Sequence, residues 1–134
     1  MSNRLLDRLL GTDAGFGTLA LRIPIGIIFV AHGAQKLFGA LGGTAMTSNP
    51  MMLVAGIIEF GGGLLIAIGL FTSWAAFISS GEMAAAYFMA HAKGGFLPIV
   101  NKGELAVVYC FLFLYIAARG AGPYSVDAML RRKP

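Results

Sequence analysis

Hydrophobic residues are concentrated in four long runs along this chain, separated by short stretches rich in glycine or polar residues. A helix needs about 20 apolar residues to cross the hydrocarbon core of a bilayer, and each run has roughly that length. We therefore predict an all-α integral membrane protein, a four-helix transmembrane bundle forming one domain over residues 1–134. The predicted spans cover about 16–38, 51–71, 74–91 and 103–119.

The two ends of the chain carry shorter amphipathic patterns. Residues 3–10, NRLLDRLL, place leucines on one helical face and charges on the other, and the C-terminal stretch SVDAMLRRK has Ser125 as a natural N-cap. We predict short interfacial helices at both termini. The N-terminal stretch has the basic head of a secretory signal but no small-residue cleavage site, so we expect it to be retained.

Composition places the chain in a lipid bilayer. Of its 134 residues, 57% are hydrophobic and only 12% are charged, and the mean hydropathy is +0.78. Soluble domains have about 25% charged residues. The formal net charge is +4, but the basic residues gather near the termini instead of forming a stripe on one face, so we expect no nucleic-acid partner.

Lysine and arginine residues also predict the orientation. Those near the two termini outnumber those in the loops at the opposite face, and an excess of basic residues marks the cytoplasmic side. We predict a multi-pass protein of the cell inner (plasma) membrane with both termini in the cytoplasm. An even number of spans requires this arrangement.

The first span includes LRIPIGIIFVAHGAQKLF, residues 21–38, which carries three basic side chains. On a helix, Arg22, His32 and Lys36 lie within a sector of about 80°, and Phe29 lies on or beside it. A charge that faces lipid in the middle of a span costs about 2.5–3.5 kcal/mol, so such residues turn toward protein or water. We predict that these side chains face the interior of the bundle.

Acidic residues in the later spans are the candidate partners. Glu59 and Glu82 lie near the middle of the second and third spans, and Glu104 lies at the start of the fourth. A rise of about 1.5 Å per residue separates the charged residues into two layers. The central layer holds Arg22, Glu59 and Glu82, and the outer layer holds His32, Lys36 and Glu104.

The two histidines raise the alternatives of haem and of a metal ion. His91 lies about 9 Å closer to the surface than His32, so we do not expect haem. A metal site built from His32, Glu59 and Glu82 lacks the Glu-x-x-His spacing of helical metal sites, so we expect no metal. His91 also points about 180° away from Glu82 on a regular helix, and the two cannot share one site without a distortion.

Two features of the second span leave alternatives open. Gly61, Gly62 and Gly63 follow Glu59, and such small residues permit either close approach of a neighbouring helix or a bend. In a structural interpretation of the charges, Arg22 neutralises one glutamate and the other is protonated, which sets the helix register. One ion pair is enough to set the register. Three unpaired charges in the membrane interior would cost roughly 9 kcal/mol, and a cost so much larger than register requires favours a functional site.

Four stretches together resemble the DoxX family of four-span membrane proteins: LRIPIGIIFVAHGAQKLFG, IEFGGGLLIAIGLFT, GEMAAAYFMAH and GELAVVYCFLFLYIAARGAGPYSVD. The resemblance implies a redox-linked role beside the quinone pool, because the family takes its name from a small subunit associated with an archaeal terminal quinol oxidase and thiosulfate:quinone oxidoreductase. The matching positions are Arg22, His32, Gly33, Lys36, Glu59, Glu82, Glu104 and Asp127.

These patterns predict a membrane subunit of a quinone-linked oxidoreductase system. Arg22, His32 or Lys36 would donate to a quinone carbonyl, while Glu59 or Glu82 would shuttle the accompanying proton. The catalytic candidates are Glu59, Glu82 and Arg22. The quinone-binding candidates are Arg22, His32, Lys36, Phe29, Glu59, Glu82 and Glu104.

Whether the chain is itself an enzyme stays open at this point. It has no flavin, haem or iron–sulfur motif, so electrons would come from a partner, and we expect a homo-oligomer or a complex with redox proteins. One alternative is a small proton-coupled permease, whose four spans would need a dimer to enclose a path. Another is a non-catalytic membrane scaffold that recruits soluble redox partners.

Overall fold

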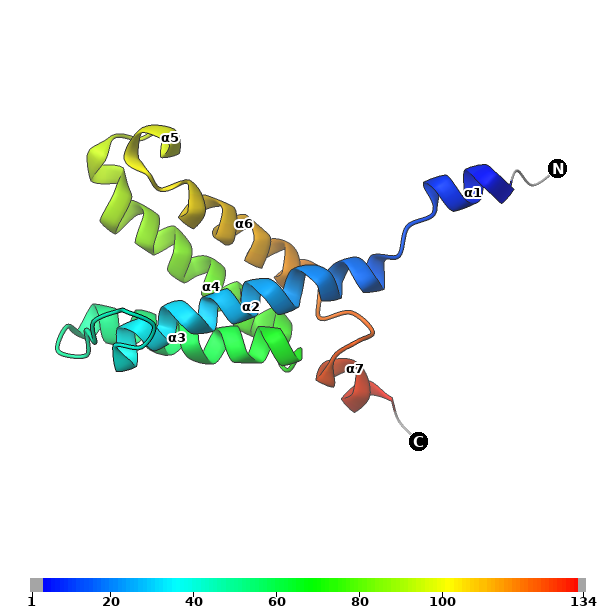
Figure 1. Cartoon of the computed structure of the whole chain (residues 1–134), viewed down its shortest axis with the longest axis horizontal. Coiled ribbons are helices and arrows are strands. Elements are labelled where there is room, and N and C mark those ends of the chain that lie inside the picture. Colours follow the sequence, from blue (N-terminus) through cyan, green and yellow to red (C-terminus); the bar gives the residue numbers. More distant parts are fainter. Residues whose placement is uncertain (1–3, 133–134) are drawn as a thin grey trace.

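The computed structural model describes residues 4–132, and over that range the chain forms helices and loops without any strand (Figure 1). The all-α prediction is confirmed, and short helices lie near both termini as expected. Residue 3 and Lys133, which the terminal predictions included, lie outside the described residues. The helices are α1 (Arg4–Leu10), α2 (Ala14–Phe38), α3 (Pro50–Ile68), α4 (Thr72–Ala86), η1 (Tyr87–His91), η2 (Ala92–Gly94), α5 (Pro98–Asn101), α6 (Glu104–Arg119) and α7 (Val126–Arg131).

Two helices, α2 and α3, are long and apolar enough to cross a membrane. The other two main helices are shorter, with 15 residues in α4 and 16 in α6. The π-helix η1 follows α4 directly, so helical structure of one kind or another runs without a break from Thr72 to His91. This continuous segment covers the third predicted span.

Local sequence signals determine the ends of the two long helices. Asp13 and Asn49 are the N-caps of α2 and α3, and the side chain of each accepts a backbone N–H group of the first turn. Both helices end at a glycine in the left-handed conformation, Gly39 with φ 65° and Gly69 with φ 77°. Side chains other than glycine rarely adopt this conformation, so the sequence stops each helix there.

The helices pack as two pairs, α2 against α3 and α4 against α6, which diverge like the arms of a V (Figure 1). The first pair approaches closely because glycine faces glycine. A β-carbon on Gly63 would lie 2.7 Å from both the carbonyl oxygen of Gly26 and the amide nitrogen of Val30. A β-carbon on Gly62 would lie 2.8 Å from the Ser79 hydroxyl oxygen, so Gly62 and Gly63 permit close approach of neighbouring helices. Gly61, in contrast, has no atom within 4 Å of such a carbon.

The two pairs meet through an apolar core. Phe29 of α2 packs on Phe113 of α6 with ring centroids 4.7 Å apart, and Ile66 and Ala76 are fully buried in the same cluster. This core ties all four main helices together. It leaves the helices free to diverge at the end that carries the 39–49 loop and α5.

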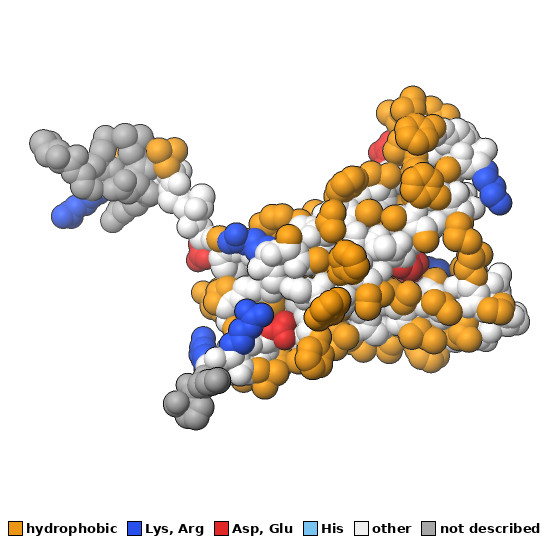
Figure 2. Space-filling view, turned by 180° about the vertical axis from the view of Figure 1, so that it is seen from behind, with side chains coloured by type: hydrophobic (Ala, Val, Ile, Leu, Met, Phe, Trp, Pro, Cys, Tyr) orange, Lys and Arg blue, Asp and Glu red, His pale blue; other side chains and the backbone are white. Residues whose placement is uncertain are grey.

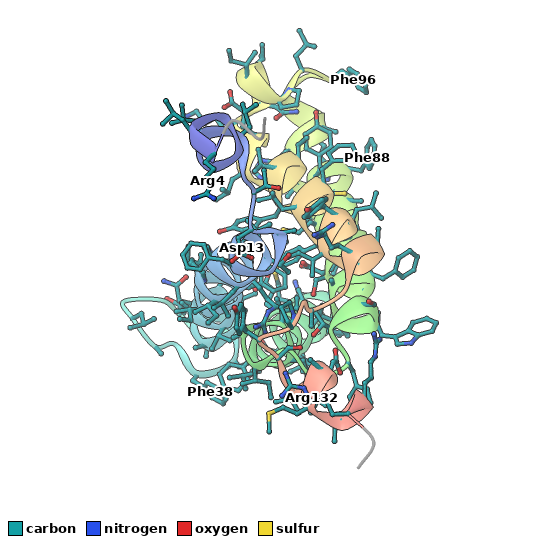
Figure 3. The ribbon with its side chains drawn as sticks, turned by 90° about the vertical axis from the view of Figure 1, so that its right-hand side faces the viewer. Arg4, Asp13, Phe38, Phe88, Phe96 and Arg132 are labelled. Atoms are coloured by element: carbon teal, nitrogen blue, oxygen red, sulfur yellow. The ribbon has the colours of Figure 1, made fainter. Side chains whose placement is uncertain are left out.

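The outer surface is strongly apolar. Figure 2 shows hydrophobic side chains spread over both arms, and Phe88 and Phe96 project outward in Figure 3. Soluble monomers rarely expose so much contiguous apolar surface, whereas a helix surface in contact with lipid requires it.

Candidate functional site

A cavity of about 770 Å³ lies between the two helix pairs, toward the end where they diverge. Its walls come from α2, α3, α4, η1 and α6, and they are mostly apolar, with alanine and methionine prominent. The space-filling view shows a hollow between the arms with acidic and basic side chains inside it (Figure 2). The ionisable lining residues are His32, Lys36, Glu59, Glu82, His91, Lys102 and Tyr109.

Lys36 and Glu59 form a close ion pair on the wall of this cavity. The Lys36 Nζ atom lies 2.8 Å from Oε1 and 2.6 Å from Oε2 of Glu59. The Glu59 side chain is only 3% exposed and that of Lys36 is 23% exposed. The predicted layers are wrong on this point, because they were counted along the backbone and the long lysine side chain carries its ammonium group back to Glu59.

Glu82 approaches the same pair from α4. Its carboxyl group lines the same cavity as Glu59 and Lys36, and its Oε2 atom is buried without a hydrogen-bond partner among the residues that the structure describes. One ammonium group therefore faces two carboxyl groups. This polar cluster of Lys36, Glu59 and Glu82 is electrically neutral only when the two carboxyl groups together hold one proton.

Arg22 lies elsewhere, although we expected it beside Glu59 and Glu82. It is 1% exposed and is absent from the cavity lining. Its guanidinium group donates to the carbonyl oxygens of Ile66 and Ala67, each at 3.0 Å, and of Tyr124 at 2.5 Å. The carbonyls at the C-terminal end of α3 lack helical partners and form the negative end of the helix dipole, so they replace a carboxylate as the partner of Arg22.

Asp127 completes the attachment of the C-terminal segment at this end. Its carboxylate accepts the N–H groups of Phe71 at 2.8 Å and Thr72 at 3.0 Å, and so caps α4. Partial burial acts to raise the pKa of Asp127, but the Thr72 and Phe71 hydrogen bonds and the nearby charge of Arg131 outweigh it and lower that pKa. We call Arg22, Asp127 and the α3–α4 turn that they bind the C-terminal latch.

The remaining predicted residues divide into two groups. Phe29 and His32 line the cavity, Phe29 as a buried side chain and His32 as an exposed one. Glu104 is exposed in the first turn of α6 and does not line the cavity, although its neighbour Leu105 does. A carboxylate in a first helical turn is favourable through the helix dipole alone. The structure therefore brings together Lys36, Glu59, Glu82, His32 and Phe29, and it leaves out Arg22 and Glu104.

Sequence reasoning missed His91, which lines the cavity together with Glu82. The distortion that this arrangement needs is the π-helix Tyr87–His91. A π-turn holds more residues than an α-turn, so side chains after it are rotated relative to a regular helix. Nothing in the local sequence YFMAH signals a π-helix.

The cavity can bind an amphipathic molecule and exchange a proton with it. Within residues 4–132, excluding the side chains not described, no group of three or more His, Cys, Asp or Glu residues could hold a metal ion. The chemistry available is that of an ammonium donor, a carboxyl pair and imidazole rings on an apolar wall. Buried ionisable groups of this kind mark ligand or proton sites in membrane proteins.

The apolar surface, the membrane-length helices and the interior charges define the class of protein, a helical membrane protein with an internal amphipathic cavity. The chain belongs to the DoxX family, whose model matches residues 17–92. That region includes Lys36, Glu59, Glu82 and His91.

Two relatives extend the similarity over most of the chain. An uncharacterized protein of Haemophilus influenzae is 45% identical over 120 residues, which is 84% of this chain and 90% of that protein. The inner membrane protein YqjF of Escherichia coli is 32% identical over 124 residues, which is 87% of this chain and 94% of YqjF. No solved structure matches the chain significantly.

Proposed function

We propose that this protein is an inner-membrane subunit of a quinone-linked oxidoreductase system and that its cavity binds the quinone ring. The observation that carries the proposal is the polar cluster of Lys36, Glu59 and Glu82 on the wall of an apolar cavity of about 770 Å³. Ligand sites commonly have volumes of about 300–1,000 Å³ and place a few polar groups on an apolar lining. A quinone ring with its first isoprene units has the matching chemistry.

The membrane arrangement belongs to the same proposal. All four main helices cross the bilayer, with both termini in the cytoplasm and the wide end of the cavity toward the outer face. Its support is the distribution of basic residues in the sequence and the similarity to a protein named as an inner membrane protein. The apolar side chains that Figure 2 shows over both arms support contact with lipid on that face of the bundle.

The chemistry divides between binding and proton transfer. Lys36 or His32 donates a hydrogen bond to a quinone carbonyl oxygen, and Phe29 lines the apolar wall. Reduction to the quinol takes two electrons, which a partner protein supplies, and two protons. The carboxyl pair of Glu59 and Glu82 delivers one proton at a time to the quinone oxygen and is reprotonated from water at the wide end.

The test is quinone binding by the full chain purified in mild detergent. We expect mass analysis to find bound quinone in the wild type, and we expect a short-chain quinone to raise its melting temperature. Lys36→Met should lose the bound quinone. Glu104→Gln is the matched control. Glu104 is a charged residue of the same region that lies outside the cavity, so this variant should retain the quinone. A wild type with no bound quinone and no thermal shift would overturn the proposal.

The carboxyl pair also favours a second candidate, a proton-coupled permease. Its support is Glu82, which lines the cavity and whose Oε2 atom has no hydrogen-bond partner in the described part of the chain and can take up a proton. Reconstituted vesicles with a trapped pH indicator separate the two functions. If a solute gradient drives proton movement and Glu82→Gln abolishes it, the result supports the permease. If the gradient drives no proton movement, the result favours the redox subunit.

A further inference from the structure

The π-helix η1 changes which residues face the cavity. In an α-helix His91 would point about 180° away from Glu82, since nine residues separate them. The i→i+5 hydrogen bonding of the π-helix reduces the rotation per residue, and both side chains line the cavity instead. Single π-turns within helices occur frequently at functional sites.

The His91 ring is held in place by two contacts. It stacks on the ring of Tyr87, with centroids 6.5 Å apart and an interplanar angle of 28°. Its Nδ1 atom lies 3.3 Å from the carbonyl oxygen of Asn101. A carbonyl oxygen only accepts, so Nδ1 carries the hydrogen, and the other ring nitrogen, Nε2, is an acceptor that stays available to a donor group of a ligand.

Asn101 and Tyr87 hold the surrounding segment together. The Asn101 Nδ2 atom donates to the Tyr87 hydroxyl at 3.0 Å and to the Gly95 carbonyl at 2.8 Å, and its Oδ1 atom accepts the N–H of Gly103 at 2.8 Å. The Tyr87 hydroxyl donates to the carbonyl of Phe96. These hydrogen bonds fix the segment that carries the His91 ring. Residues outside the first contact layer do the same in preorganised binding sites.

We infer that His91 is a ligand-contacting residue, the second polar contact of the cavity. His91 and Glu82 are nine residues apart along continuous helix and both line the cavity, so a ring can lie between His91 and the polar cluster. The identity of the ligand rests on the proposed function. The reduced form of the quinone, a 1,4-hydroquinone, has two hydroxyl groups at opposite ends of its ring, so the polar cluster binds one and the Nε2 atom of His91 accepts a hydrogen bond from the other.

This arrangement makes the cavity selective for molecules with two polar ends. Two probes test it on the full chain in detergent: a decyl-substituted 1,4-hydroquinone, and a decyl-substituted phenol with one hydroxyl group. We expect His91→Leu to weaken binding of the hydroquinone roughly 3- to 10-fold, the effect of one lost hydrogen bond, and to leave phenol binding unchanged. His91→Gln, whose amide oxygen can accept the same hydrogen bond, should restore part of the hydroquinone affinity.

Met89→Leu is the matched control, because Met89 lies in the same π-helix and lines the same cavity without a strong polar group. It should leave the ratio of the two affinities unchanged. Equal weakening of both probes by His91→Leu, or no weakening, would overturn the inference while the proposed function stands. A wild type that binds no quinone would overturn the proposed function itself.

Discussion

Two basic residues on one face of α2 have different partners because their side chains differ in shape. The planar guanidinium of Arg22 has five N–H donors and serves three carbonyl oxygens at once. The Lys36 ammonium is a compact charge on a flexible stem and binds one carboxylate through both oxygens. Arg22 therefore has a structural role at the C-terminal latch, and Lys36 takes the role in the cavity.

The ion pair predicts that removal of Lys36 and removal of Glu59 lower the free energy of unfolding by different amounts. Lys36→Met leaves the buried Glu59 carboxylate without its cation and should cost about 3–5 kcal/mol of unfolding free energy. Glu59→Gln should cost less, because the Lys36 side chain is the more exposed partner, 23% against 3%. The double variant should recover most of the loss. Unfolding followed by circular dichroism in detergent measures all three, and a double variant as unstable as Lys36→Met would contradict this account.

At the scale of single elements, α3 shows that neighbouring glycines differ in function. Gly63 faces backbone atoms of α2, which cannot move aside, while Gly61 has no atom within 4 Å of the position of an added β-carbon. Sequence alone makes these two residues equivalent. Their different environments come from the 100° that separates each residue from the next around a helix.

Two matched substitutions test this difference. Gly63→Val should destabilise the fold by about 3 kcal/mol or more, because the α2–α3 pair would have to separate. Gly61→Ala should be neutral or stabilising by up to about 1 kcal/mol, since alanine favours a helix over glycine. Thermal unfolding of the two purified variants is the measurement, and equal effects would show that α2 and α3 are not closely packed at Gly63.

The helix α7 depends on Asp127 for its attachment, and this attachment depends on pH. The lowered pKa of Asp127 means that its stabilisation is complete above the ordinary aspartate value of about 3.9 and is lost only as the pH falls through the lower folded value. A spin label on Met129→Cys in a Cys110→Ala background reports the mobility of α7. We expect low mobility at and below the ordinary aspartate pKa of about 3.9, and an increase in mobility only as the pH falls further, through the lower folded pKa of Asp127.

Asp127→Asn should show the mobile state already at neutral pH. Asp13→Asn is the control, because Asp13 caps a different helix, α2, and should leave the label unchanged. A transition near pH 6 in the wild type would assign the change to another titrating group.

At the scale of the whole molecule, the cavity is open at one end and closed at the other. The C-terminal latch joins the ends of α2, α3 and α4, and the apolar core around Phe29 and Phe113 lies between the latch and the cavity. The helix pairs diverge beyond that core (Figure 1). A ligand or proton therefore reaches the polar cluster from the wide end or from between the arms.

The proposed topology makes a labelling prediction. In a Cys110→Ala background, Ser48→Cys and Lys93→Cys should react with a membrane-impermeant maleimide in intact spheroplasts, because both loops lie at the wide end. Met129→Cys should react only after the membrane is permeabilised. Labelling of Ser48→Cys and Lys93→Cys from opposite sides would contradict four spans.

The sequence by itself determined the helical class and the membrane setting, because these depend on the apolar runs. It also predicted the end of α2 at Phe38, but the second predicted span, about 51–71, runs three residues beyond α3, which stops at Ile68 because Gly69 adopts the left-handed conformation. The sequence further identified Lys36, Glu59 and Glu82 as interior charges, because an isolated charge in an apolar run must face away from lipid.

Only the tertiary structure decided which of these charges meet. Backbone depth does not describe the reach of a lysine side chain, so a prediction from depth alone puts Lys36 too far from Glu59. The Tyr124 carbonyl that binds Arg22 is 102 residues away in the chain, and no local pattern reveals such a partner. The π-helix that turns His91 toward the cavity was likewise hidden, because helical periodicity read from sequence assumes α-helical rotation throughout.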